Sequence, residues 1–169
     1  DPLWSRGLGD VYKRQTLAGL LLQRGWMLAT AESCTGGMIA AACTDRAGSS
    51  EWFERGLVSY SNAAKHDLLG VPEPLIAEHG AVSEPVARAM AEGAIAHSRA
   101  QCSVAVTGVA GPGGGSAAKP VGTVWFGWNV YGTTHSECLR FDGDRAAVRQ
   151  ATMVHALQRL NALISARLL

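Results

Sequence analysis

Short apolar segments of strand type alternate with helical patterns along most of this chain. The strand-type segments are rich in apolar or β-branched residues and lie at 26–31, 53–61 and 102–107. Amphipathic or small-residue helices are expected around them, at 16–25, 35–43, 62–69, 74–79 and 84–99. A hairpin (121–131 and 134–141) and a long helix (144–164) follow. This order predicts a single α/β layered domain with a mixed β-sheet flanked by helices.

Length and composition agree with one compact domain. The chain has 169 residues, of which 47% are hydrophobic and 17% are charged. Its formal charge of +1 provides no broad basic field for nucleic acid or for an anionic membrane surface. No segment reaches the 18 apolar residues of a membrane span, and no signal peptide is evident. We therefore expect a soluble cytoplasmic protein, and the apolar, glycine-rich composition is compatible with a homo-oligomer.

Residues 1–15 (DPLWSRGLGDVYKRQ) differ from the remainder because they have no sustained helical or strand period. We interpret them as an N-terminal extension, either an artefact or a natural flexible lead, and leave them out of the functional reasoning. The functional domain is expected to span 16–169.

The sequence Glu-Ser-Cys-Thr-Gly-Gly connects a predicted strand to a predicted helix. Peptide N–H groups at the start of a helix favour negative charge and can bind an oxyanion or a phosphate. Ser33 is therefore a candidate nucleophile, and Gly36 and Gly37 would let a substrate or a neighbouring helix come close. The alternative is that Ser33 or Thr35 only caps the helix.

A second junction, Tyr-Ser-Asn-Ala-Ala-Lys, ends at Lys65, with Asn62 as the expected helix cap. If Lys65 points inward beside Ser33, it can act as a general base, and Tyr60 can relay a proton or orient the amine. Lowering a lysine pKa from about 10.4 to about 7.5 requires roughly 4 kcal/mol of desolvation or like-charge repulsion. The alternative is a solvated helix lysine.

Two further segments suggest anion binding. A glycine-rich loop begins after the strand that ends at Thr107, but its spacing matches neither a P-loop nor a dinucleotide fingerprint. Arg145 begins the last helix, where a planar guanidinium suits a phosphate or a carboxylate. The alternatives are a flexible surface loop and a surface ion pair of Arg145 with Asp142.

Other chemistry has weaker support. The four cysteines, Cys34, Cys43, Cys102 and Cys138, form no metal-binding or CxxC pattern and are expected to be reduced thiols. The five histidines are dispersed, so neither a metal nor another cofactor is expected.

Together these segments resemble the C-terminal domain of the competence/damage-inducible protein CinA, a family whose stand-alone members include nicotinamide mononucleotide amidohydrolases of the PncC type. The resemblance covers about residues 16–165 and includes AESCTGG (31–37), VSYSNAAK (58–65), TGVAGPGGG (107–115), KPVGTVWFG (119–127) and GDRAAVR (143–149).

The resemblance implies hydrolysis of the carboxamide of nicotinamide mononucleotide to nicotinate mononucleotide and ammonia by a Ser-Lys mechanism, without a metal. It implies Ser33 as the acylated nucleophile and Lys65 as the base, with Tyr60 nearby. The residues implied in substrate binding are Cys34, Thr35, Gly36, Thr107, Gly108, Gly111 and Arg145. A non-catalytic nucleotide-binding or regulatory module, and an amidase for a different small amide, remain alternatives.

Overall fold

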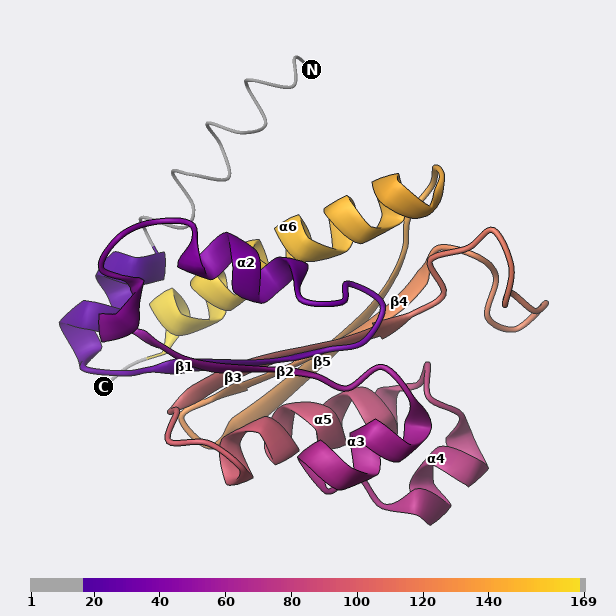
Figure 1. The fold of residues 1–169 in the computed structure, drawn as a ribbon, viewed down its shortest axis with the longest axis horizontal. Helices are drawn as coiled ribbons and strands as arrows, with labels where there is room; N and C mark the ends of the chain where they lie inside the picture. The colour runs from indigo at the N-terminus through magenta and orange to yellow at the C-terminus, as the bar shows by residue number, and fades with distance from the viewer. Residues whose placement is uncertain (1–16, 168–169) are drawn as a thin grey trace.

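The computed structural model describes residues 17–167 of the chain. A five-stranded sheet forms the middle layer, with helices on both of its faces (Figure 1). The strands are β1 (Leu28–Glu32), β2 (Phe53–Val58), β3 (Cys102–Gly108), β4 (Thr123–Val130) and β5 (Thr133–Arg140). The helices are α2 (Met38–Thr44), η1 (Ser49–Glu51), α3 (Asn62–Leu69), α4 (Glu73–His79), α5 (Glu84–Ala96) and α6 (Arg145–Ala166), and residues 17–24 are also helical. The expected extension at 1–15 lies outside the described residues.

The strand order is β2-β1-β3-β4-β5. β1 pairs in parallel with β2 and β3, whereas β4 pairs antiparallel with both β3 and β5. Every residue of β1 is buried, because this strand has neighbours on both edges and helices on both faces. The prediction of a mixed α/β sheet is confirmed.

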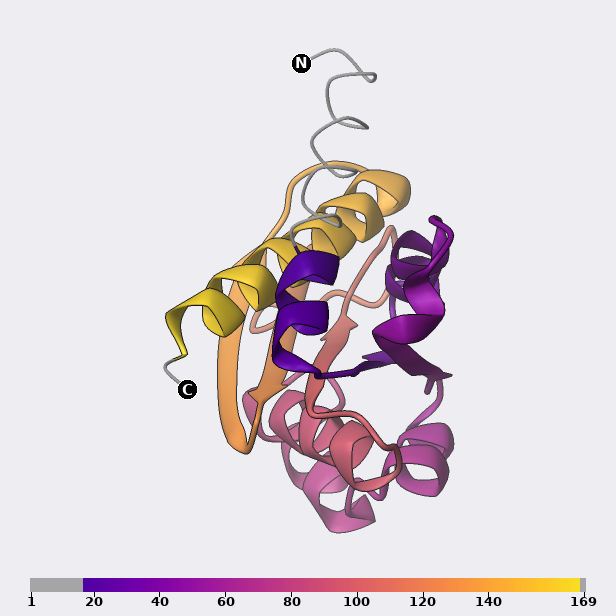
Figure 2. The ribbon, with the colours of Figure 1, turned by 90° about the vertical axis from the view of Figure 1, so that its left-hand side faces the viewer.

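Each face of the sheet has its own hydrophobic core. On one face, α2, α6 and the helix at 17–24 cover the sheet (Figures 1 and 2). The core on this face includes Leu28, Val104 and Phe126. On the other face, α3, α4 and α5 lie over Ala31 and Ala105. Helix α5 approaches the sheet closely, because a Cβ added at Gly127 would lie 2.4 Å from the backbone oxygen of Ala87.

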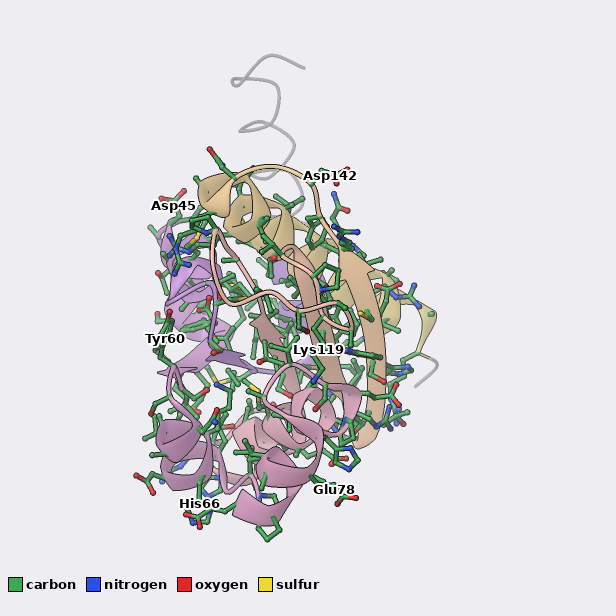
Figure 3. The ribbon with its side chains drawn as sticks, turned by 90° about the vertical axis from the view of Figure 1, so that its right-hand side faces the viewer. Asp45, Tyr60, His66, Glu78, Lys119 and Asp142 are labelled. Atoms are coloured by element: carbon green, nitrogen blue, oxygen red, sulfur yellow. The ribbon has the colours of Figure 1, made fainter. Side chains whose placement is uncertain are left out.

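The chain connections diverge at the carboxyl ends of the parallel strands. From β1 the chain crosses one face through α2 to β2, and it returns across the other face through α3, α4 and α5 to β3. In open α/β sheets, ligands bind outside the carboxyl ends of the strands where such connections diverge. Figure 3 looks onto this edge of the sheet.

Several helix ends differ from the expected ones. The cap of α3 is Ser61, not Asn62, because the Ser61 hydroxyl accepts a hydrogen bond from the Ala64 N–H at 3.0 Å. Helix α5 ends at Ala96 rather than Arg99, since His97 leaves the helical backbone conformation. The cap of α6 is Asp144, whose carboxylate accepts from the Ala147 N–H at 2.9 Å. None of the helices between residues 17 and 167 is long and apolar enough to cross a membrane.

Candidate active site

Ser33 directly follows β1 and is fixed from both neighbouring strands. Its N–H donates to the Val106 carbonyl at 3.2 Å, which extends the β1–β3 ladder by one residue. On the other side, the Ser59 N–H donates to the Glu32 carbonyl at 2.8 Å. Ser33 is 7% exposed, so its hydroxyl lies in a largely desolvated position at the carboxyl edge of the sheet.

Lys65 reaches the Ser33 hydroxyl from α3. Lys65 and Leu69 form the buried face of this short helix, one turn apart. Side chains in a helix point back toward its N-terminus, which brings the Lys65 amine to the start of α3. Lys65 Nζ lies 3.0 Å from Ser33 Oγ, 3.1 Å from the Ser59 carbonyl and 3.0 Å from the Tyr60 carbonyl. Lys65 is only 1% exposed, so the alternative of a solvated helix lysine is wrong.

Burial of Lys65 disfavours the charged form of its amine. Burial lowers the pKa of Lys65 from its usual 10.5, because the charged form loses its hydration. The carbonyls of Ser59 and Tyr60 can only accept, so they take the two hydrogens of a neutral amine. In the structure Nζ donates to Ser33 Oγ and the Ser33 hydroxyl donates to the Tyr60 carbonyl at 3.3 Å, so the hydroxyl must turn its proton toward the Nζ lone pair before a transfer. After proton transfer, the three hydrogens of the ammonium find three acceptors in the same place, so both protonation states are accommodated.

A buried carboxylate organises the loop that follows the nucleophile. The Glu32 carboxylate accepts from the Thr35 hydroxyl at 2.6 Å and from the N–H groups of Ile39 and Ala40 at 2.8 and 3.0 Å. It therefore satisfies free N–H groups at the start of α2, although it lies outside that helix. The turn itself needs glycine, since Gly36 has a φ of +59° and Gly37 a φ of +109°.

The peptide N–H groups after Ser33 are not all equally available. The Gly36 N–H donates to the Ser33 carbonyl at 3.1 Å. Within residues 17–167, the N–H groups of Cys34 and Thr35 donate to no backbone carbonyl. Gly36 is exposed, so this loop borders solvent close to the largely buried hydroxyl. These two donors can stabilise a developing oxyanion.

Cys34 is less suited than Ser33 to act as a nucleophile. Burial raises the pKa of the Cys34 thiol to about 11. The thiolate is the reactive form of cysteine, and this raised pKa disfavours it at neutral pH.

Tyr60 contributes its backbone to the observed contacts. Its carbonyl accepts from Lys65 Nζ at 3.0 Å and from Ser33 Oγ at 3.3 Å. Its ring is on the surface, with 61% of the residue exposed (Figure 3). A catalytic role of the Tyr60 hydroxyl stays a prediction.

The glycine-rich loop and Arg145 meet at the same edge. Arg145 Nη1 donates to the Gly111 carbonyl at 2.9 Å rather than pairing with Asp142. A cavity of about 470 Å³ lies beside this contact. Its walls are formed by the loop and the start of α6, namely Ala110, Pro112, Val121, Gly143, Asp144, Arg145 and Ala146.

The two residues at the start of this loop have other contacts. The Thr107 hydroxyl is buried and donates to the Ala81 carbonyl at 3.0 Å. Gly108 lies against β4, where an added Cβ would be 2.8 Å from Val124 Cγ2. Substrate binding by Thr107 and Gly108 stays a prediction, and the observed contacts of both residues are with the fold.

Two residues that contact the loop after Ser33, Glu32 and Arg149, were not assigned a role from the sequence. Glu32 could have been recognised, because it is the one charged residue in the buried strand Leu-Ala-Thr-Ala-Glu. Arg149 lies one helical turn after Arg145, yet its guanidinium contacts the loop after Ser33, donating to the carbonyls of Cys34 and Thr35 at 3.1 Å each. No cluster of three or more His, Cys, Asp or Glu side chains that could hold a metal ion occurs in the described part of the chain.

The fold and the site define a class of protein: an α/β domain with a buried serine–lysine pair at the carboxyl edge of its sheet. The family model described as the CinA C-terminal domain matches residues 12–164. This chain belongs to the CinA C-terminal domain family.

Named relatives of similar length agree with this membership. The chain is 54% identical over 143 residues to the nicotinamide-nucleotide amidohydrolase PncC of Escherichia coli K12, covering 83% of this chain and 86% of that protein. It is 59% identical over 131 residues to the Pseudomonas putida protein of the same name, covering 78% and 82%. A CinA-like protein of Mycolicibacterium gilvum is 53% identical, but this chain covers only 34% of its length.

Solved structures have the same fold. The competence damage-inducible protein A of Klebsiella pneumoniae superposes with a TM-score of 0.90 at 38% identity, covering 94% of this chain and 99% of that one. The competence/damage inducible protein CihA of Agrobacterium tumefaciens gives 0.87 at 46% identity, with 91% and 94% covered.

Proposed function

We propose that this protein hydrolyses the carboxamide of nicotinamide mononucleotide to nicotinate mononucleotide and ammonia, with Ser33 as the nucleophile and Lys65 as the base. One observation carries the mechanism: a buried lysine amine lies 3.0 Å from a serine hydroxyl, with its other contacts going to two carbonyls. The choice of substrate is supported by the names of relatives that are 54% and 59% identical.

In the first half-reaction, neutral Lys65 takes the proton of Ser33 Oγ as the oxygen attacks the carboxamide carbon. The carbonyl oxygen becomes an oxyanion, which the N–H groups of Cys34 and Thr35 stabilise. Collapse of this intermediate breaks the C–N bond, and the Lys65 ammonium gives its proton to the leaving nitrogen. Ammonia departs, and the acyl group remains on Ser33 as an ester.

In the second half-reaction, Lys65 takes a proton from water, and the resulting hydroxide attacks the ester carbon. The C–O bond to Ser33 breaks, and the proton held by Lys65 returns to Ser33 Oγ. The free acid leaves, and both side chains are restored. One base thus serves both halves, in the way that histidine serves a serine–histidine–aspartate triad.

The substrate's phosphate group requires a cationic or N–H-rich contact. We assign it to the start of α6 and the glycine-rich loop, where Arg145 and Gly111 border the cavity described above. Arg145 is exposed, and its contact with a single carbonyl leaves further N–H donors for an anion. We further propose that the reaction takes place in the cytoplasm, in agreement with the free thiols of all four cysteines.

Ammonia release from nicotinamide mononucleotide tests this function. The unmodified chain should release ammonia without added metal and in the presence of a chelator. Ser33→Ala and Lys65→Ala should each abolish the release while keeping the wild-type circular dichroism spectrum. Ammonia release by either variant at the wild-type rate would reject the Ser-Lys mechanism.

Two other results would replace the proposal. Saturable nucleotide binding with no turnover would indicate a regulatory module. Faster hydrolysis of another amide in a panel containing nicotinamide, nicotinamide riboside and glutamine would indicate a different substrate.

A further inference from the structure

Arg149 lies one turn inside α6 and is half-buried against the loop that follows the nucleophile. Its Nε donates to the Cys34 carbonyl and its Nη2 to the Thr35 carbonyl, both at 3.1 Å. These residues are 115 and 114 positions away in sequence, so the contact joins the last helix to the first strand-to-helix turn. Arg149 Nη2 would also be 3.5 Å from a Cβ added at Gly36.

The two contacts determine where peptide N–H groups point. A trans peptide is planar, and its C=O and N–H bonds are directed oppositely. Because Arg149 holds the Cys34 carbonyl on its own side, the Thr35 N–H of the same peptide is directed away from Arg149. This N–H is one of the two in the loop that donate to no backbone carbonyl within residues 17–167.

The second donor is fixed through the next peptide. Arg149 holds the Thr35 carbonyl, and the Gly36 N–H at the other end of that peptide donates to the Ser33 carbonyl at 3.1 Å. The Ser33 carbonyl is thereby fixed, and the Cys34 N–H, which shares its peptide plane, is directed away from it. Three successive peptides are thus held by one guanidinium and one turn hydrogen bond.

We propose that Arg149 is a positioning residue that preorganises the N–H groups of Cys34 and Thr35 as the oxyanion-binding donors. This inference rests on the proposed acyl transfer at Ser33. The guanidinium suits the role because its planar fork can hold two carbonyls at once, whereas a lysine ammonium is a single point charge on a flexible stem. Oxyanion donors stabilise the transition state more than the bound substrate, so their loss lowers kcat more than it raises KM.

The test compares Arg149→Ala and Arg149→Lys with Arg88→Ala. Arg88 is a matched control because it is also half-buried and also donates two hydrogen bonds, to the Ser136 hydroxyl and the Thr134 carbonyl on β5. Arg149→Ala should lower kcat about 100-fold, the effect of losing one such donor, with KM changed less than about threefold. Arg149→Lys should recover only part of the rate, and Arg88→Ala should keep the wild-type kcat.

Two further measurements separate positioning from folding. Millimolar guanidinium ion should partly restore the kcat of Arg149→Ala, because it can refill the space between the two carbonyls. The pH midpoint of kcat/KM should be unchanged, since Lys65 does not contact Arg149. An increase in the KM of Arg149→Ala at constant kcat would instead indicate that Arg149 contacts the substrate. A kcat of Arg149→Ala within threefold of the wild-type value would show that Arg149 does not position the donors. Either result overturns the inference.

The labelling rate of Ser33 by a fluorophosphonate provides a readout that does not depend on the natural substrate. It should fall in Arg149→Ala by a factor similar to that of kcat. A wild-type chain that is labelled but does not release ammonia from nicotinamide mononucleotide would reject the proposed substrate, while slower labelling of Arg149→Ala would still support the role of Arg149. Equal labelling of the two proteins, or none in either, would overturn it.

Discussion

Replacing Lys65 with Met removes the base but keeps an unbranched side chain of similar length. We expect kcat/KM for amide hydrolysis to fall about 10²–10⁴-fold, the usual contribution of a general base. This corresponds to about 3–5 kcal/mol of transition-state stabilisation. No other side chain can replace Lys65 as the base, because the hydroxyl of Ser33 has only Lys65 Nζ and the Tyr60 carbonyl as hydrogen-bond partners within residues 17–167.

A double-mutant cycle makes the prediction sharper. Ser33→Ala alone should lose as much activity as Lys65→Met, and the double variant should lose no more than the larger single loss. This is expected because the base has nothing to activate once the hydroxyl is absent. If the two losses multiplied in the double variant, the side chains would act independently and the Ser-Lys mechanism would be wrong.

The assay is ammonia release under saturating and subsaturating substrate, with folding monitored in parallel. Lys65→Met leaves the buried Ser59 carbonyl without the Nζ donor, which costs about 1–3 kcal/mol, whereas the Tyr60 carbonyl keeps the Ser33 hydroxyl as a donor. Removing a buried amine offsets part of this cost. Urea unfolding must therefore establish that the variant is folded at the assay temperature. A folded Lys65→Met protein with more than a tenth of wild-type activity would refute the reasoning.

Three further predictions concern stability. Because burial lowers the pKa of Lys65, the unfolded chain binds more protons than the folded chain between that pKa and 10.5. The free energy of unfolding of the wild type, relative to that of Lys65→Met, should therefore rise with pH across this window when measured by urea titration. A flat or falling difference would contradict the burial argument. Glu32→Gln should lower the free energy of unfolding by about 2–3 kcal/mol, since an amide cannot accept all three hydrogen bonds, and a loss below about 0.5 would be inconsistent with this role. Gly111→Ala should lower the free energy of unfolding by about 2–4 kcal/mol, because φ is +85° and the new Cβ would lie 2.4 Å from Val121 Cγ1. Gly113→Ala should change it by less than about 0.5 kcal/mol, because no atom lies within 4 Å of the new Cβ. Equal effects of the two substitutions would argue against this conformation of the loop.

Local sequence was sufficient for the order and type of the elements. The strand-type segments around Ala29, Leu57 and Val104 became β1, β2 and β3, because apolar and β-branched residues fit a buried sheet. Helix ends were less predictable. Ser61 and Asn62 are both good caps, and only the backbone geometry selects the Ser61 hydroxyl as the acceptor.

The site depended on contacts between distant segments. The sequence around Lys65 allowed either an exposed or an inward side chain, and burial by the packing of α3 against α5 decides between them. The partner of Arg149 could not be read from α6, since it lies 115 residues away in a turn whose conformation depends on Gly36 and Gly37. The role of the Tyr60 carbonyl was also beyond prediction, because sequence patterns describe side chains rather than backbone acceptors.

The protonation of Lys65 is the most direct test of the proposed mechanism. Its side-chain resonances can be followed by NMR across the pH range, with Lys65→Met used for assignment, while kcat/KM is measured over the same range. We predict a titration midpoint below the ordinary 10.5 and a kcat/KM that rises with pH through that same midpoint, because the neutral amine is the active form. A midpoint at 10.5 or above, or a rate that is indifferent to this titration, would contradict a lysine base at Ser33.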